Sequence, residues 1–302
     1  MSSGAEQFAE TASGVVSASQ FFEGKHIHVY SGRLEDVEEK VRFLTLAPGV
    51  DDDSVQSAFT RVCGQWQNPS THPNVVTVHD RGRRPRPWLA TEMPDGYRLE
   101  QLWQHVSAMD IKMIVDDVAE AVRNAGLYNT RHLALGPKHV WVDWGEEVTA
   151  TVDNWGIYRA CSVAAGEAPV WPYTAPELVE DPQAGSAETD VYGLGAIAYF
   201  ALTGRSLFPT ADDLTTAILE DPITPPGEIV PQLPRAVDDV VFSALSRDPS
   251  ERHQSAHEFK EQFRQAMPEE VPALGDGLRT IPPASQASET VTGDDRATPS
   301  DS

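Results

Sequence analysis

The order of its predicted elements constrains this chain most, because strand-like segments come first and helical segments follow. Up to about Glu92, short runs rich in β-branched and aromatic residues predict strands, and one helical pattern at 53–65 interrupts them. Beyond that residue, apolar positions recur mainly at helical spacing. Strands and helices that are segregated along a chain are typical of α+β folds. We therefore expect a small β-rich lobe, a larger helical lobe and a cleft between them.

The individual elements divide the chain into four regions. Strands are predicted at 27–31, 41–46, 75–79, 88–92, 139–142 and 149–153, and later helices at 99–106, 111–125, 190–202, 214–219, 236–245 and 256–266. Small polar residues at 1–17 predict a flexible N-terminus. The β-rich lobe then covers 18–92 and the helical lobe 93–268. Residues 269–302 are rich in Pro, Ser, Thr, Gly and Asp, which predicts a disordered acidic tail.

The net charge is −23, with five lysines against eighteen arginines. Acidic residues are spread along the whole chain, which favours a surface adapted to concentrated salt over an acidic patch for a basic partner. Such a field repels phosphate backbones, so we expect no nucleic-acid partner.

The sequence contains no run of eighteen apolar residues, so we expect no membrane span. Its first residues show no basic segment followed by an apolar stretch, so we expect no secretory signal. Cys63 and Cys161 are isolated, as buried thiols of a cytoplasmic protein would be.

Several short motifs occur in a fixed order through the second half of the chain. They are Ala175-Pro176-Glu177, the run Thr-Asp-Val-Tyr-Gly-Leu-Gly at 189–195, Leu-Thr-Gly at 202–204 and Asp-Pro-Ser-Glu-Arg at 248–252. With His-Pro-Asn-Val-Val at 72–76, this order resembles the Hanks-type serine/threonine protein kinases over roughly residues 18–268. The resemblance implies a two-lobed, protein-kinase-like α+β fold.

The resemblance also implies structural roles for four residues. Glu177 should form a buried ion pair with Arg252, which ties the activation segment to the last helices. Asp190 should hold the backbone of the catalytic loop, and His132 should support the core beneath that loop. The alternative is that these are surface charges and a solvated histidine.

The phosphate-binding parts of the family pattern are degenerate in this sequence. The stretch that matches the glycine-rich loop is 22–27, and of its glycines only Gly24 remains. Side chains at the other positions would block close approach of phosphates to the backbone. The family's β3 lysine is replaced by Leu44, and its αC glutamate falls at Val62 or Cys63.

The catalytic and metal positions are replaced as well. By resemblance, the catalytic base aspartate is Ala134, the metal-binding asparagine is His139 and the metal-binding aspartate of the D-F-G motif is Asn154. A distorted loop could swing Asp153 toward a metal, but strand alternation turns it away from the side of its neighbour. We therefore predict no catalytic residues, no metal site and no cofactor, with ATP and Mg²⁺ binding only if the chain is an active kinase after all.

The adenine-binding positions carry bulky residues. Arg42 and Trp141 stand where the family has a small alanine above the base and a leucine below it, while Thr91 is the gatekeeper and Met93 the hinge residue. We expect the Arg42 guanidinium within about 6 Å of the Trp141 ring, with no open adenine-sized cavity between Thr91 and Trp141. The alternative is that both side chains rotate out to solvent.

These features predict a catalytically inactive kinase homologue, a pseudokinase that acts as a scaffold or allosteric signalling partner. A weak serine/threonine kinase and a metal-independent nucleotide sensor are the alternatives. The expected partner is a protein, either an active kinase or a phosphothreonine-binding protein that reads threonines of the tail. Trp171, in the activation segment 154–177, is suited to a protein contact.

Overall fold

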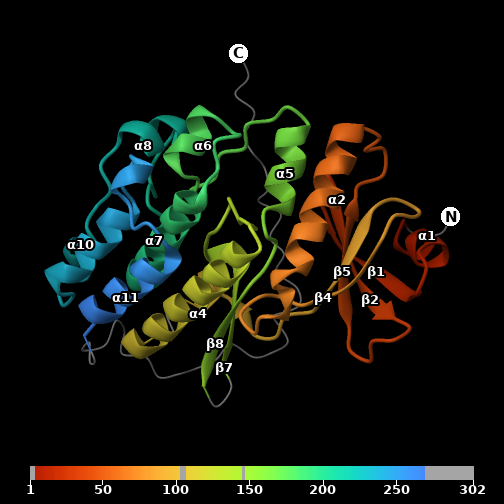
Figure 1. The fold of residues 1–302 in the computed structure, drawn as a ribbon, viewed down its shortest axis with the longest axis horizontal. Helices are drawn as coiled ribbons and strands as arrows, with labels where there is room; N and C mark the ends of the chain where they lie inside the picture. The colour runs from red at the N-terminus through yellow and green to blue at the C-terminus, as the bar shows by residue number, and fades with distance from the viewer. Residues whose placement is uncertain (1–3, 103–106, 145–146, 269–302) are drawn as a thin grey trace.

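A five-stranded antiparallel sheet forms the first lobe of the computed structural model, which describes residues 4–102, 107–144 and 147–268 (Figure 1). Its strand order is β1-β2-β3-β5-β4. The strands are β1 (Val15–Glu23), β2 (Ile27–Leu34), β3 (Val41–Leu46), β4 (Val78–Gly82) and β5 (Trp88–Glu92). A helical lobe follows, so the predicted two-lobed α+β fold is confirmed.

Helix α2 (Asp53–Gln67) covers one face of this sheet. The helix begins where the Asp52 side chain accepts hydrogen bonds from the Ser54 and Val55 backbone N–H groups, the usual N-cap arrangement. Its apolar stripe includes Phe59 and Trp66, which are fully buried in the main core. The Trp66 indole N–H donates to a backbone carbonyl at 3.0 Å, so its one polar group is satisfied.

The predicted flexible N-terminus is wrong for residues 4–17. Residues Gly4–Thr11 form helix α1, and β1 begins at Val15. The Phe8 side chain is 1% exposed, with its ring centroid 5.2 Å from that of Tyr30 and 5.5 Å from that of Phe43. Because Phe43 and Leu44 are successive strand residues that belong to different apolar clusters, α1 and α2 cover opposite faces of the sheet.

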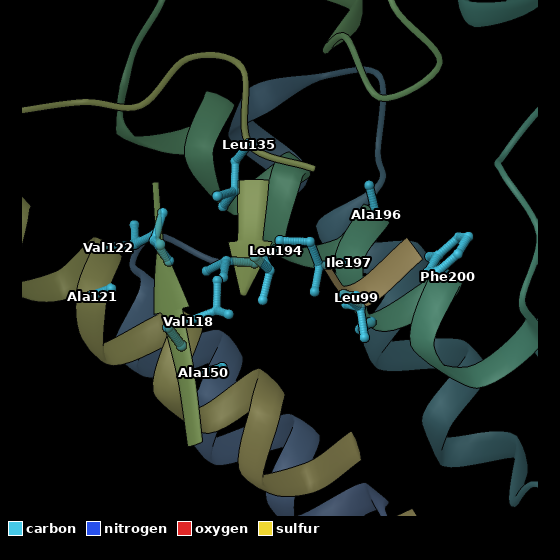
Figure 2. Close-up of a cluster of buried hydrophobic side chains, with 14 of the residues drawn as sticks. Leu99, Val118, Ala121, Val122, Leu135, Ala150, Leu194, Ala196, Ile197 and Phe200 are labelled. Atoms are coloured by element: carbon cyan, nitrogen blue, oxygen red, sulfur yellow. The ribbon is translucent and has the colours of Figure 1, made fainter. Parts of the chain in front are cut away.

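The second lobe is built around a buried helix. Helix α7 (Ala187–Thr203) is buried on all sides from Thr189 onward, and its Leu194 and Ile197 pack with Val118 and Val122 of α4 (Figure 2). The other helices here are α3 (Leu99–Leu102), α4 (Ala108–Leu127), α5 (Ile157–Ala164), α6 (Pro176–Glu180), α8 (Leu214–Glu220), α9 (Pro226–Ile229), α10 (Arg235–Ala244) and α11 (Ala256–Ala266). A small antiparallel sheet, ordered β6-β7-β8, faces the first lobe with strands β6 (Tyr97–Arg98), β7 (Val140–Trp144) and β8 (Val148–Val152).

One strand starts three residues later than predicted. Residues 75 and 76 belong to the interface between the lobes, because Val75 forms a bridge with Val152 and the Val76 N–H donates to the Val152 carbonyl at 2.9 Å. Half of the predicted helix at 99–106 and the predicted tail at 269–302 lie outside the described residues. Among the helices that the structure describes, none is long and apolar enough to cross a membrane.

Candidate functional site: the cleft between the lobes

A buried ion pair joins the two lobes in the middle of the cleft. Arg42 lies on β3, and its Nη1 donates to Asp153 Oδ2 at 2.8 Å from across the cleft. Both side chains are only 6% exposed. The Arg42 guanidinium also donates a long hydrogen bond, 3.4 Å, to the hydroxyl of Thr91 on β5. Burial by itself would raise the pKa of Asp153, but Arg42 holds that pKa below its usual value.

The floor of the cleft completes this arrangement. Trp141, on β7, donates its indole N–H to the same Asp153 oxygen at 3.0 Å. The Arg42 guanidinium carbon lies 5.8 Å from the centroid of the Trp141 ring, and that of Arg98 lies 4.8 Å from it. We call Arg42, Arg98, Trp141 and Asp153 the cross-cleft cluster. Its members fill the space between the sheet of the first lobe and β7 with paired charge and an indole.

The sequence anticipated only part of this cluster. Arg42 and Trp141 lie within the expected distance, and both are buried instead of turned to solvent. Sequence reasoning considered Asp153 only as a metal ligand and did not consider Arg98. Because successive strand residues point to opposite faces, the Asp153 side chain is expected on the face opposite that of Asn154. In the structure, this is the face on which Arg42 lies, so alternation was the sequence signal for the position of Asp153.

Behind the cluster, the two positions that hold metal in the family pattern contact each other. Asn154 Nδ2 lies 3.3 Å from His139 Nε2, and the His139 ring is 5.3 Å from that of His132. Burial lowers the pKa of His132 to about 4 and lowers that of His139 well below its usual value, so both imidazoles are neutral near pH 7. His132 Nε2 lies 2.9 Å from the Asp153 carbonyl oxygen and its ring packs on Trp155, at the base of the cleft.

No phosphate or metal ligands appear at the other degenerate positions. Leu44 is buried in the main core, as are Val62 and Cys63 of α2. Within residues 4–102, 107–144 and 147–268, no three His, Cys, Asp or Glu side chains are grouped so that they could hold a metal ion. At the edge of the cleft, Met93 is followed by Pro94, which has no backbone N–H to offer a base.

A cavity of about 360 Å³ remains open in front of the cluster. Ala134 lies in its wall, together with the cationic Arg98 and Lys138. Aromatic side chains form much of the rest: Phe21, Phe22, Tyr158, Trp171 and Tyr173. The Lys138 ammonium lies 5.2 Å from the Trp171 ring centroid, so this tryptophan packs within its own domain.

The turn that matches the glycine-rich loop is bound to the activation segment. Lys25 and His26 both contact the Glu167 carboxylate, with His26 Nε2 at 3.0 Å. The Phe22 ring also meets Tyr158 edge-on at 6.4 Å. Helix α5, which holds Tyr158, packs against α2. The turn therefore rests on protein groups at the place where the family pattern would hold phosphates.

The structural motif residues are joined as the resemblance implied. Arg252 donates two hydrogen bonds to Glu177, at 2.9 Å and 2.7 Å, and the hydroxyl of Thr189, which sequence reasoning missed, donates a third at 2.7 Å. The Asp190 carboxylate accepts from the His132 and Leu133 backbone N–H groups at 2.9 Å and 2.7 Å. This carboxylate therefore holds the first residues of the catalytic loop.

Comparisons with known proteins agree with this fold. The family model for the protein kinase domain matches residues 23–263. The serine/threonine-protein kinases PknJ and PknB of Mycobacterium tuberculosis are each 29% identical to the chain, over 62% and 74% of its length. The chain spans only 34% and 39% of those relatives. The crystal structure of the M. tuberculosis PknI kinase domain covers 84% of the chain, and the chain covers 99% of that domain, with a TM-score of 0.65 at 22% identity. The chain belongs to the protein kinase family.

Proposed function

We propose that this kinase homologue does not transfer phosphoryl groups and acts instead through protein contacts, as a scaffold or allosteric partner. The observation that carries the proposal is the cross-cleft cluster. A nucleotide base needs a flat, largely apolar slot, and here that slot holds a buried ion pair and an indole. Expelling these groups would leave Asp153 buried without its cation, which is costly.

The residues present do not fit magnesium and ATP. Phosphoryl transfer depends on positioned cations, metal ligands and a base. Leu44, Ala134 and Asn154 cannot supply the charges that lysine and aspartate supply in the family pattern. His139 is neutral and faces Asn154.

An active serine/threonine kinase is the second candidate, and the relatives favour it. Both curated relatives are named as serine/threonine-protein kinases. The open cavity in front of the cluster would also admit a small anion, because Arg98 and Lys138 line it. A rearrangement that frees Asp153 from Arg42 would have to precede any nucleotide binding of the family type.

Incubation of the purified protein with labelled ATP and Mg²⁺ or Mn²⁺ decides between these functions. We expect no incorporation of label into the protein itself or into generic acceptor proteins. Thermal melting with ATP, with and without Mg²⁺, should show no shift, since only ligands of the folded state stabilise it. Stoichiometric labelling that His139→Ala abolishes would establish the kinase, and a metal-independent shift would establish a nucleotide sensor.

A pocket-opening variant tests the cluster directly. Trp141→Leu combined with Arg42→Ala removes the indole and the guanidinium, and it should create a slot that binds adenosine weakly. Asp153→Asn added to this variant removes the unpaired charge and serves as the folding control. Isothermal titration that finds equal adenosine binding to the parent and to the opened variant would contradict a filled base site.

A further inference from the structure

The cavity in front of the cross-cleft cluster is lined by aromatic side chains from both lobes. Phe21 and Phe22 belong to β1 of the first lobe, whereas Trp171 and Tyr173 belong to the activation segment of the second. Its volume of about 360 Å³ lies near the lower end of the range of about 300–1,000 Å³ that is typical of small-molecule sites. The space is therefore suited to a ligand of one or two rings.

The inner wall of this cavity carries no uncompensated negative charge. Ala134 and Asn154 stand in the wall where the family pattern has aspartates. The Asp153 carboxylate is neutralised by its ion pair with Arg42. Glu100, the other acidic residue in the lining, is exposed at the mouth of the cavity. The wall thus lacks the carboxylates that would draw in a metal cation.

Positive charge remains in the same wall. Arg98, Lys138 and Arg159 line the cavity, and no carboxylate in the described part of the chain forms an ion pair with Arg98 or Arg159. Arg159 is only 6% exposed, and its guanidinium donates to the Pro182 carbonyl at 2.6 Å. Burial lowers the pKa of Arg159, and the Asp190 carboxylate offsets this only in part. A bound anion would stabilise this buried charge.

Two buried polar atoms of cavity residues have no hydrogen-bond partner among the described groups. They are Arg42 Nε, which is a donor, and Asn154 Oδ1, which is an acceptor. Both residues line the cavity and are only 5% exposed. Buried polar groups are rarely left unpaired in folded proteins. A ligand that carries an acidic group and a hydroxyl group can supply both missing partners.

We propose that this cavity binds a small hydroxylated aromatic carboxylate without a metal ion, with its carboxylate at the wall formed by Arg98, Lys138 and Arg159. Guanidinium and ammonium groups hold carboxylates through short charge-assisted hydrogen bonds. The ring of the ligand packs among the aromatic side chains of the lining, in the offset or edge-to-face geometry that such rings prefer. The proposal rests on the proposed function in one respect, because the ligand lies in front of a base slot that stays filled.

Charge and shape distinguish this ligand from a nucleotide. A nucleoside triphosphate needs a slot for its base, and it needs metal ions and cations for its phosphate charges. The base slot holds the Trp141 indole and the Arg42–Asp153 pair. A single carboxylate needs no metal ion, and the cationic side chains of the lining are sufficient to balance it.

A ligand in this cavity would join the two lobes. Its ring would contact Phe21 and Phe22 of β1 on one side and Trp171 of the activation segment on the other. The same two regions already meet where Lys25 and His26 contact Glu167. We therefore expect binding to hold the activation segment against the first lobe and so to regulate the surface that this homologue presents to a partner.

The test compares matched probes in isothermal titration and thermal melting of the full chain. Para-hydroxybenzoate and 6-hydroxy-2-naphthoate carry the proposed groups, and the corresponding amides replace the carboxylate by a neutral group of the same shape. We expect at least one of the acids to bind about tenfold or more tightly than its amide, and to raise the melting temperature equally with and without Mg²⁺. Equal affinities of acid and amide, or no binding of either acid at about 1 mM, would overturn the proposal.

Variants locate the bound acid. Lys138→Gln removes one charge from the wall and should weaken binding of the acid about tenfold. Lys40→Gln, the same change at an exposed position outside the lining, should alter it less than about twofold. Ala134→Leu narrows the cavity without a change of charge, so it should weaken the naphthoate more than the benzoate. Melting temperatures close to the parent show that each variant is folded, and unchanged binding to both Lys138→Gln and Ala134→Leu would place the acid elsewhere and refute the assignment.

This titration and the labelling experiment fail separately. Incorporation of label from ATP would refute the proposed inactivity, whereas failure of the acids to bind would refute only the ligand. Hydrogen exchange measured with the acid should slow at residues 21–26 and 167–173, and unchanged exchange there would contradict a ligand that joins the lobes. Displacement of the bound acid by metal-free ATP, with tighter binding of the ATP, would show a nucleotide site and overturn the proposal.

Discussion

Replacing Arg42 by leucine should destabilise the protein by about 3–5 kcal/mol, because the Asp153 carboxylate would remain buried without its cation. The separation of 2.8 Å between the charged atoms corresponds to a gross attraction of about 6 kcal/mol at an effective dielectric constant of ~20. The Trp141 indole N–H still donates to the carboxylate in this variant. That remaining hydrogen bond places the expected loss toward the lower end of the range.

Urea unfolding followed by tryptophan fluorescence measures this loss, and a double-mutant cycle isolates the pair. Arg42→Leu together with Asp153→Leu removes both charges and should recover most of the stability, because an apolar replacement of a buried pair is often close to neutral. Arg33→Leu, at an exposed site, is the control and should change the free energy of unfolding by less than about 0.5 kcal/mol. A loss below about 1 kcal/mol for Arg42→Leu, or additive effects in the cycle, would refute a buried pair of this strength.

Three further predictions concern stability. Glu177→Ala should cost about 3–5 kcal/mol, because Arg252 has no exposed side-chain surface and loses its two-point partner, and a melting temperature within a degree of the parent would contradict this. His132, whose pKa falls from 6.5 to about 4 on folding, contributes stability that is present above pH 6.5 and is lost as the pH falls toward 4. The difference between parent and His132→Gln in urea should shrink by about 3 kcal/mol over that range, and a constant difference would contradict it. Phe8→Ala should cost about 3–5 kcal/mol in calorimetry, against little change for the half-exposed Tyr128→Ala.

The local sequence pattern correctly predicted the elements whose own residues carry a strong strand or helix signal. The predicted bounds of β3, β5 and α11 are those of the structure, because β-branched and aromatic residues mark the two strands and an apolar stripe at helical spacing marks α11. Helix α1 was missed because eight residues rarely form a helix alone, and this one depends on packing Phe8 against the sheet. Helix α1 is stabilised by contacts with strand residues that are distant from it in the sequence.

In the cleft too, the sequence predicted some contacts and missed others that depend on residues distant in the chain. The resemblance placed Arg42 and Trp141 on facing strands, since the fold assigns each strand a position. Asp153 lies 111 residues from Arg42 in the chain, and its pairing depends on which way one strand end turns. Arg98 joined the cluster from a two-residue strand that sequence reasoning did not identify. Strand alternation can indicate the side to which Asp153 turns, but which groups lie on that side follows from the assembled fold.

The links between the lobes have a consequence for cooperativity. A two-lobed protein with an empty cleft can pivot about its connecting segment, and its lobes then melt with some independence. Here the lobes are tied in the middle by Arg42 and Asp153, and at the front by the contacts of Lys25 and His26 with Glu167. Any pivoting motion has to separate opposite charges. We therefore expect the two lobes to unfold together in one cooperative transition.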